Sequence, residues 1–354
     1  MTRKRTALIS AGVAAGAIAA GAAGRVAVRR HRDHPGEGAM WDLPPEDLGP
    51  VTSFDGTELA VRAAGPTQAP VLLFVHGFSL DGTTWFEQWM DLSVDYRCVV
   101  MDQRSHGLSG RAVDDDLTLR SMGRDIAAVL DVVAADRPAM IVGHSMGAMA
   151  ILALAEQRPE LFGPRVAGVV LIGAASSDLI QGAMGAVTQL LRPRLGSLSA
   201  AVRRVDRLRK AVLASPADIR GSVVRLTQFG PDASQHAVDH VVQLAQRASS
   251  SVWTDGLAEI MDVDQRHAVP NVRVPALVVV GEHDRITPPA AAVELAGALP
   301  DGRLVVVEGA GHMAMLERPV ELDRELRLFA RSVFGAPPVV SAPARGRKAA
   351  GGNA

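Results

Sequence analysis

Six short runs of almost wholly apolar residues recur through the middle of the chain, and they limit its possible folds more than any other feature. They cover residues 71–75, 98–101, 140–142, 169–172, 276–280 and 304–307. Uninterrupted runs rich in β-branched residues are typical of parallel strands that are buried on both faces. Ahead of them, an Asp55-Gly56 turn signal followed by alternating apolar residues predicts a hairpin over 54–63.

Helical periodicity fills several of the gaps between these runs. Residues 119–133 place Met122 and Ile126 on one face, and residues 146–157 form an Ala-, Leu- and Met-rich segment that ends before Pro159. Regular alternation of strands and helices predicts an α/β fold with an open, doubly wound, mostly parallel sheet. In such a sheet, functional residues collect at the carboxyl ends of the strands.

The remaining segments are arranged around this core, which we expect over 50–177 and 263–334. Residues 178–262 contain no clear strand and several helical segments, so we expect them to form an inserted helical cap over the strand ends. Residues 33–49 are rich in Pro, Gly and acidic side chains, which is typical of a linker. The last segment, 335–354, is rich in Pro, Ala and Gly, which predicts a disordered tail.

Residues 1–32 differ in composition from the rest of the chain. Three basic residues precede an uncharged run of 19 residues at 6–24, and four arginines follow it. As a helix this run would be about 28 Å long, close to the thickness of bilayer hydrocarbon, although most of its residues are Ala or Gly. It predicts a cleaved signal peptide or a retained anchor, hence a membrane-anchored or exported protein. An extension without targeting function on a cytoplasmic protein is the alternative.

The charge balance excludes a general nucleic-acid binder. The 37 Lys and Arg residues face 38 Asp and Glu residues, a net charge of -1 at pH 7, whereas binding to phosphates needs a basic excess. Aromatic residues make up only 4%, which argues against stacking on bases. The one cysteine, Cys98, excludes an intramolecular disulfide framework and a Cys-clustered zinc site.

The strongest local signal for chemistry is Gly143-His144-Ser145-Met146-Gly147. It lies between an apolar run and an Ala-rich helix, the context in which G-x-S-x-G forms a nucleophile elbow. Such a turn holds Ser145 in a strained conformation, and Gly143 and Gly147 leave room for close backbone packing. The backbone N–H of Met146, at the helix N-terminus, would stabilise an oxyanion. A plain turn with a capping serine is the alternative.

A serine hydroxyl needs a base to become a good nucleophile, and the base needs an acid to orient it. The expected chain order for this architecture is Ser, then Asp or Glu, then His. Asp284 and His312 follow the last two apolar runs, so we expect both on the same rim of the sheet as Ser145. Asp178 is the alternative acid. Simpler roles exist for both residues, namely a turn carboxylate paired with Arg285 for Asp284 and an ordinary loop histidine for His312.

A second oxyanion donor is expected in the loop after 71–75, where His76-Gly77-Phe78 follows. The backbone N–H of Phe78 is the candidate. Gly77 permits the chain to turn close to a substrate, and the side chain of His76 can hold the loop by a hydrogen bond. An ordinary strand-to-helix turn is the alternative.

Three further clusters support weaker hypotheses. The expected cap carries a basic cluster, which predicts either a lid that faces anionic lipid or, as we favour, a solvated helix face. Its members are Arg192, Arg194, Arg203, Arg204, Arg207, Arg209 and Lys210. His236 and His240 have helical spacing for a shared metal, but there is no third ligand or H-E-x-x-H pattern, so we expect no metal. Trp85, Phe86 and Trp89 line either an acyl pocket or the core.

Together these motifs resemble the α/β-hydrolase fold family, within its group of capped esterases and lipases. The resemblance spans about 70–320 and is carried by HGF at 76–78, DQRSHGLSG at 102–110, GHSMG at 143–147, GEHDRITPP at 281–289 and GAGHMAMLERP at 309–319. One departure is Ser105, where relatives usually have Gly, and it should affect the turn more than the chemistry. Asp102 and Arg104 look like structural residues of that loop.

The resemblance implies a serine hydrolase that cleaves small-molecule or lipid esters without a cofactor or metal. It implies nucleophile Ser145, acid Asp284, base His312 and oxyanion N–H groups of Phe78 and Met146. Epoxide hydrolases and haloalkane dehalogenases of this family use an Asp nucleophile, so Ser145 argues against both. Perhydrolases of the haloperoxidase type and carbon–carbon bond hydrolases keep the same three residues and stay alternatives, as does a non-catalytic binding protein. The sequence does not indicate an oligomeric state.

Overall fold

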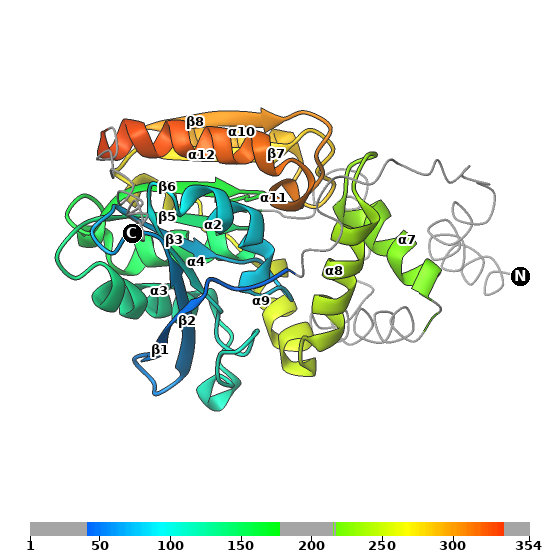
Figure 1. Cartoon of the computed structure of the whole chain (residues 1–354), viewed down its shortest axis with the longest axis horizontal. Helices are drawn as coiled ribbons and strands as arrows, with labels where there is room; N and C mark the ends of the chain where they lie inside the picture. The colour runs from blue at the N-terminus through cyan, green and yellow to red at the C-terminus, as the bar shows by residue number, and fades with distance from the viewer. Residues whose placement is uncertain (1–40, 178–214, 216, 336–354) are drawn as a thin grey trace, which may run out of the picture.

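The computed structural model describes residues 41–177, 215 and 217–335 (Figure 1). Its centre is an eight-stranded sheet in the order β1-β2-β4-β3-β5-β6-β7-β8. β1 and β2 pair antiparallel, β2 is antiparallel to β4, and the strands from β3 to β8 run parallel. The expected doubly wound, mostly parallel sheet is confirmed.

The strands contain the predicted apolar runs and extend them by a few residues at most. They are β1 Glu46–Thr52, β2 Glu58–Ala64, β3 Val71–Val75, β4 Arg97–Met101, β5 Ala139–His144, β6 Val166–Ile172, β7 Ala276–Gly281 and β8 Gly302–Val307. β3, β4, β5 and β7 are buried at every residue, which explains why their sequences do not alternate. β8 lies at one edge of the sheet and leaves Leu304 and Val306 partly exposed.

Helices pack on both faces of the sheet. One apolar cluster joins it to α3 (Leu119–Val133), α4 (Met146–Gln157) and α10 (Pro289–Ala298), and a second joins it to α2 (Phe86–Leu92), α11 (Ala314–Glu317) and α12 (Pro319–Phe334). Short helical turns are η1 Gly82–Trp85, η2 Val113–Asp115, η3 Pro159–Leu161 and η6 Val269–Asn271. α3 and α4 have the bounds that the sequence predicted, because each combines a continuous buried face with a clear start and stop.

The start of the folded core corrects one sequence prediction. β1 begins at Glu46, inside the segment 33–49 that we expected to be a linker. Its Pro and charged residues are tolerated because β1 lies at the edge of the sheet, where the pairing with β2 also shifts register before Pro50. The residues just before β1 contact the core as well, since Trp89 Nε1 donates to the carbonyl of Asp42 at 3.1 Å.

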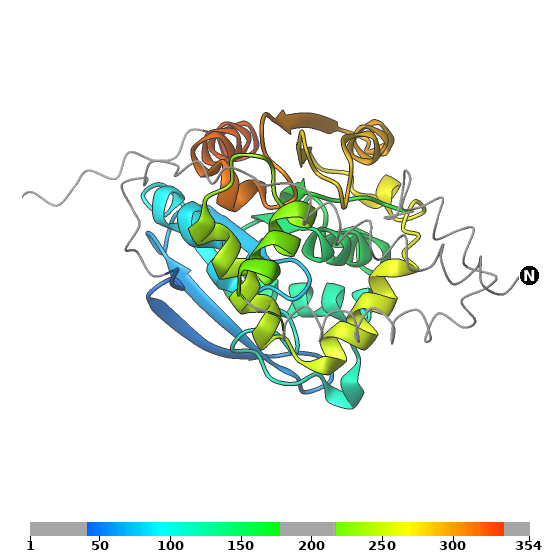
Figure 2. The ribbon, with the colours of Figure 1, turned by 90° about the vertical axis from the view of Figure 1, so that its right-hand side faces the viewer.

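A helical segment is inserted between β6 and β7. It contains α7 (Ala217–Gln228), α8 (Gln235–Arg247), the π-helical turn η5 (Val252–Gly256) and α9 (Leu257–Met261), which we call the cap helices. Figures 1 and 2 show them at the end of the sheet to which β6 points. Residues 178–214 and 216 of the expected cap lie outside the described residues, and with them Asp178 and the basic cluster.

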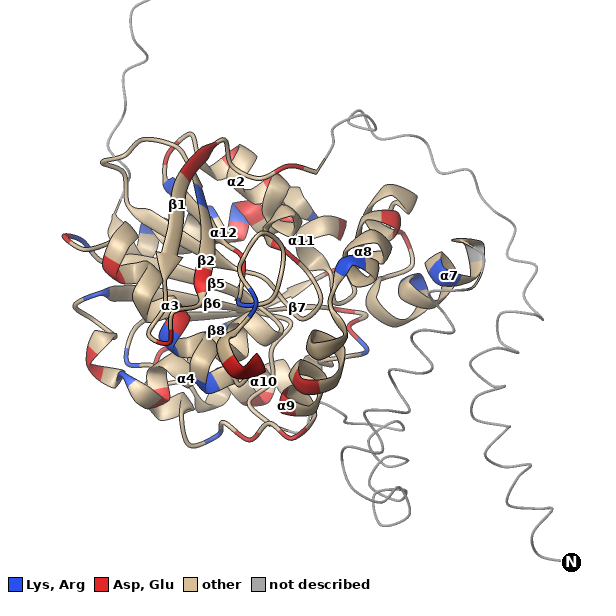
Figure 3. Cartoon of the chain, turned by 90° about the horizontal axis from the view of Figure 1, so that it is seen from below, with Lys and Arg blue, Asp and Glu red and all other residues tan. Residues whose placement is uncertain are grey.

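The terminal segments 1–40 and 336–354 also lie outside the described residues, so the targeting segment and the disordered tail stay predictions. Within the described ranges, no helix has the length and apolar character that crossing a membrane requires. Figure 3 shows basic and acidic residues interspersed along the described helices and loops, in keeping with the net charge of -1.

Candidate active site

Ser145 occupies a sharp turn between β5 and α4, with φ 51° and ψ −116°. A positive φ is strained for a residue with a side chain, and it persists only where the surroundings enforce it. Here the N–H of Ser145 donates to the carbonyl oxygen of Ile172 on β6 at 2.8 Å. The carbonyl oxygen of Ser145 in turn accepts the N–H of Ala148, in the first turn of α4, at 2.9 Å. The predicted strained elbow is therefore present, while the role of Ser145 as a nucleophile stays a prediction.

The two glycines of the elbow stand where no side chain fits. A Cβ on Gly147 would overlap the carbonyl oxygen of Val75 at the end of β3. A Cβ on Gly143 would come within 2.7 Å of the backbone nitrogen of Ala148. Both glycines thus let α4 start directly against the sheet, as the motif predicts.

His312 and Asp284 lie in contact in loops that follow β8 and β7. His312 Nδ1 is 2.8 Å from Asp284 Oδ2, and both side chains are buried. The other carboxylate oxygen, Oδ1, accepts the backbone N–H groups of Ile286 and Thr287 at 2.8 and 2.9 Å. Burial acts to raise the pKa of Asp284, but His312 and the Thr287 donors outweigh it, so this pKa lies below its ordinary value. The carboxylate is therefore ionised at neutral pH.

The elbow and the His312 loop meet around Gly173, the first residue after β6. The carbonyl that holds the N–H of Ser145 belongs to the preceding residue, Ile172. A Cβ on Gly173 would lie 3.1 Å from two ring atoms of His312. The elbow also contacts the His312 loop directly, because Nε2 of His144 is 3.0 Å from the carbonyl oxygen of His312. The three residues predicted as a triad thus stand at the carboxyl ends of strands in one neighbourhood of the sheet.

His144 contributes packing and a hydrogen bond, as predicted, and is unsuited to act as a base. Burial, and then repulsion from the positive charge that a protonated His312 would carry, lower its pKa well below the ordinary value. The imidazole is therefore neutral, and its contact with a carbonyl oxygen requires the proton to sit on Nε2.

The loop after β3 lies directly against the elbow. A Cβ on Gly77 would be 2.6 Å from His144 Nδ1, so only glycine allows this approach. His76 holds the loop, because its Nε2 accepts the backbone N–H of Gln103 at 3.0 Å. Phe78 follows on this loop, and Met146 is the first residue of α4, where backbone N–H groups have no acceptor within the helix. The loop and the helix N-terminus are thus neighbours, as an oxyanion hole requires.

Sequence reasoning missed three residues that support this site. Thr287 donates its hydroxyl to Asp284 Oδ2 at 2.8 Å, and the D-x-x-T spacing was a readable turn signal. Gly173 was visible only as a glycine at the end of an apolar run. Glu317 accepts the backbone N–H of Gly311 at 2.8 Å, and its one sequence signal was a carboxylate in an otherwise apolar segment.

The loop after β4 has the structural role that we expected. The buried Arg104 donates from Nε and Nη2 to the carboxylate of Asp125 at 2.6 and 2.7 Å. Asp102 accepts the backbone N–H of Leu108 at 2.7 Å. Ser105 has φ 61°, the left-handed region that glycine favours, so its departure from the family pattern does fall on a turn.

Trp41 connects the histidine pair to the aromatic cluster, because its ring also lies against that of Phe86, with centroids 5.9 Å apart. His236 and His240 stack on Trp41, with ring centroids 5.4 and 4.9 Å away. Trp85 is fully buried against Phe74, which makes it a core residue. In the described part of the chain, no group of three or more His, Cys, Asp or Glu residues could hold a metal ion.

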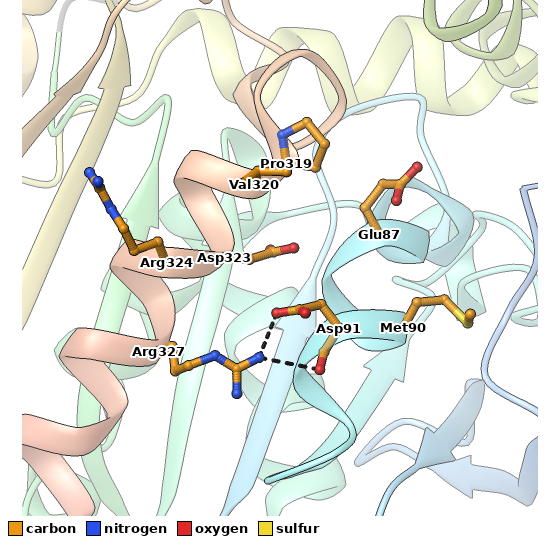
Figure 4. Close-up of a pocket in the computed structure, with 8 residues that line it drawn as sticks. All are labelled: Glu87, Met90, Asp91, Pro319, Val320, Asp323, Arg324 and Arg327. Carbon is orange, nitrogen blue, oxygen red and sulfur yellow. Dashed lines mark hydrogen bonds and ion pairs between the residues drawn. The ribbon is translucent and has the colours of Figure 1, made fainter. Parts of the chain in front are cut away.

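A cavity of about 560 Å³ lies between α2 and α12, and its lining does not include Ser145, Asp284 or His312. Figure 4 shows Arg327 of α12 reaching Asp91 of α2 across it, with an ion pair of 2.6 Å. A second hollow, of about 440 Å³, lies between the β4 loop and the start of η5. It is lined by Ser105, Ser109, Arg111, Ser249, Ser250 and Ser251.

Comparisons with known proteins agree with this architecture. A non-heme chloroperoxidase of Burkholderia pyrrocinia is 25% identical over 289 residues, covering 80% of this chain and 99% of the relative. A bifunctional esterase/perhydrolase of Acinetobacter calcoaceticus is 25% identical over 297 residues, 80% of this chain and 100% of the relative. The structure of a thermophilic esterase from Thermogutta terrifontis superposes with a TM-score of 0.65 at 23% identity, covering 81% of this chain and 99% of that one.

The model of one protein family matches most of the described core. It is the model of the alpha/beta hydrolase fold, and it matches residues 70–319. These residues contain the elbow, the loop after β3 and both members of the His312–Asp284 pair. The chain therefore belongs to the alpha/beta hydrolase fold family.

Proposed function

We propose that this protein is a serine hydrolase that cleaves carboxylic esters through Ser145, His312 and Asp284. The observation that carries the proposal is the 2.8 Å contact between His312 and an ionised Asp284, beside a serine held in a strained elbow. Strain at a functional turn and a buried His–carboxylate pair are both typical of sites for nucleophilic catalysis.

The geometry supports a defined proton path. An ionised carboxylate only accepts hydrogen bonds, so Nδ1 of His312, which faces Asp284, carries a proton. This leaves Nε2 free to accept the proton of Ser145 as its hydroxyl attacks the ester carbonyl. Asp284 then stabilises the imidazolium that forms.

The backbone N–H groups of Phe78 and Met146 would bind the oxyanion of the tetrahedral intermediate. His312 would return its proton to the leaving alcohol, and water activated by the same histidine would release the acid from the acyl-enzyme. Each bond that forms at the carbonyl carbon is thus matched by one that breaks.

A fluorophosphonate probe tests the proposal, since it labels only an activated serine. We expect the protein to be labelled and to hydrolyse short p-nitrophenyl esters. Ser145→Ala should lose both properties while keeping its melting temperature within a few degrees. Labelling at another residue, or turnover by Ser145→Ala, would refute the assignment. A folded parent protein without labelling would favour a binding role for the site.

Peroxide-dependent chemistry is the second candidate, and the comparisons supply its support. Two of the relatives above are named a chloroperoxidase and an esterase/perhydrolase, at 25% identity each. In such a reaction a short carboxylic acid would acylate Ser145 with release of water. Hydrogen peroxide, in place of water, would then attack the acyl carbon as its bond to Ser145 breaks, and a peracid would leave. The peracid oxidises bromide to hypobromous acid and is itself reduced to the carboxylic acid. Bromination that requires both peroxide and a short carboxylic acid, and that Ser145→Ala abolishes, would support this candidate. Carbon–carbon bond cleavage uses the same residues and needs its own substrates.

A further inference from the structure

The cap helices contact the loop of His312 directly through their backbone. The N–H of His312 donates to the carbonyl oxygen of Gln228, the last residue of α7, at 2.8 Å. This bond joins the residue that we propose as the base to the inserted segment, and no member of the sheet takes part in it.

Two glycines make this contact unusually close. A Cβ on Gly311 would lie 2.5 Å from the backbone nitrogen of Gly230. A Cβ on Gly230 would overlap the carbonyl oxygen of Gly309. The turn 228–230 and the loop 309–312 therefore pack backbone against backbone.

One buried carboxylate bridges the two segments. Glu317 is only 8% exposed. Its Oε2 accepts the N–H of Gly230 at 2.6 Å, and its Oε1 accepts the N–H of Gly311 at 2.8 Å. Each oxygen thus serves a different segment, one from the cap helices and one from the loop before His312.

The two N–H groups approach different oxygens of the Glu317 side chain, so their positions fit a group with two acceptor oxygens. A carboxylate meets this requirement, whereas the amide of glutamine offers one oxygen and turns an NH₂ group toward the other N–H. Replacing Glu317 by Gln would therefore leave one buried donor facing another donor, at nearly unchanged volume. This makes the substitution a clean probe of the bridge.

We propose that Glu317 is a positioning residue, which holds His312 in its working place by tying the loop of that histidine to the turn 228–230 of the cap helices. The inference rests on the function proposed above, because it needs His312 to be the base. It adds that docking of the cap turn is a condition for catalysis. Glu317 itself touches neither Ser145 nor the Asp284 carboxylate in any described hydrogen bond.

Kinetics of Glu317→Gln in the full-length protein test the proposal, with Glu321→Gln as the matched control. Glu321 is exposed in the first turn of α12. Its substitution by Gln makes the same chemical change as at Glu317, one carboxylate oxygen replaced by an NH₂ group. We expect Glu317→Gln to lower kcat for a p-nitrophenyl ester about 10- to 100-fold, with KM nearly unchanged, because a small displacement of a base acts on the chemical step. Glu321→Gln should behave as the parent protein.

Hydrogen–deuterium exchange tests the bridge without reference to catalysis. In Glu317→Gln, peptides that contain 228–231 and 309–313 should exchange faster together, while peptides from α3 and β5 should not change. If the parent protein proves to have no reactive serine, the function proposed above fails, and this exchange experiment still decides whether Glu317 ties the two segments.

Gly230→Ala gives an independent approach from the cap side, and it serves if Glu317→Gln does not fold. It should lower kcat in the same way, and the double variant should lose less than the product of the two single losses, since both break one contact. Faster exchange of both peptides with an unchanged kcat would overturn the proposal. So would a lower kcat with unchanged exchange, or fully multiplicative losses.

Discussion

At the scale of single residues, the candidate site depends on a few side chains that each have several partners. The Oδ2 atom of Asp284 is hydrogen-bonded to His312 Nδ1 and accepts the hydroxyl of Thr287. Its Oδ1 atom accepts two backbone N–H groups. Such a carboxylate has little freedom to rotate. The orientation of the His312 ring is therefore set by residues that a search for catalytic types alone would pass over.

Asp284→Asn should lower kcat about 10³- to 10⁴-fold, because an amide can donate to Nδ1 and so favour the wrong tautomer of His312. The fold should be kept, since Asn matches Asp in size and can still accept the backbone donors. Steady-state kinetics on a p-nitrophenyl ester, with a melting curve beside them, measure the effect.

Glu282→Gln is the control for that variant, because Glu282 lies two residues away and is exposed. It should leave kcat unchanged within about twofold. A large loss in Glu282→Gln together with normal turnover by Asp284→Asn would mean that the acid has been assigned to the wrong residue.

Residue types and spacing were enough to predict the elbow, the role of His76 and the His312–Asp284 pair. They were not enough for Glu317, because its partners are backbone N–H groups, which every residue carries. The N–H of Gly230 comes from 87 positions away in the chain. Contacts of this kind depend on how segments dock, and no local pattern encodes them.

At the scale of elements, the strands buried on both faces were the most predictable part of the molecule. β3 has the bounds of its apolar run, whereas β1 was missed because an edge strand needs no apolar pattern and tolerates Pro50. α3 and α4 were predicted from their apolar residues and their ends. The cap helices were expected only as a helical region, since their bounds depend on contacts with the core.

The junction of α4 with the sheet allows a test at this scale. Gly147→Ala places a Cβ against the carbonyl of Val75 and 2.6 Å from that of His76, so α4 must shift away from β3. We expect the free energy of unfolding to fall by about 1 to 3 kcal/mol, with a loss of serine labelling. Urea denaturation and the fluorophosphonate probe measure the two effects.

Gly297→Ala is the matched control, since Gly297 is a helical glycine of α10 with no atom within 4 Å of its missing Cβ. There alanine should leave labelling unchanged and raise the free energy of unfolding by roughly 0.5 to 1 kcal/mol. Equal destabilisation by both substitutions would contradict a close approach that is specific to the elbow.

At the scale of the whole molecule, α2 from the first part of the core packs against α12, the last helix of the core. Asp323 of α12 is buried there, where it accepts Gln88 Nε2 of α2 at 3.0 Å. Burial, with the nearby charges of Asp91 and Glu87, raises the pKa of Asp323 to about 7. The contact therefore titrates in the neutral range.

This pKa predicts how global stability depends on pH. Because the folded protein holds this proton more tightly than the unfolded chain, the stability that Asp323 contributes is full below pH 4 and is lost as the pH rises to about 7. Asp323→Asn should remove this dependence and raise the free energy of unfolding at pH 8 by roughly 1 to 3 kcal/mol. Urea denaturation at pH 5 and pH 8 measures it.

Asp301→Asn is the control, because Asp301 is exposed in the turn before β8. Its stability should follow the parent protein at both pH values. The prediction fails if the difference in the free energy of unfolding between Asp323→Asn and the parent protein is the same at pH 8 as at pH 5. That result would show that the Asp323 carboxyl is ionised at little cost to stability.

The order of the strands along the chain has a consequence for the protein while its synthesis is still incomplete. The elbow follows the fifth strand and the histidine loop follows the eighth, so that His144 and His312 touch across 168 positions of sequence. On a translating ribosome, the strained serine would emerge long before the histidine that we propose as its base. On the proposed mechanism, a nascent or truncated chain that lacks the last strand would have an inert serine, and the serine would become reactive only when the final part of the core docks.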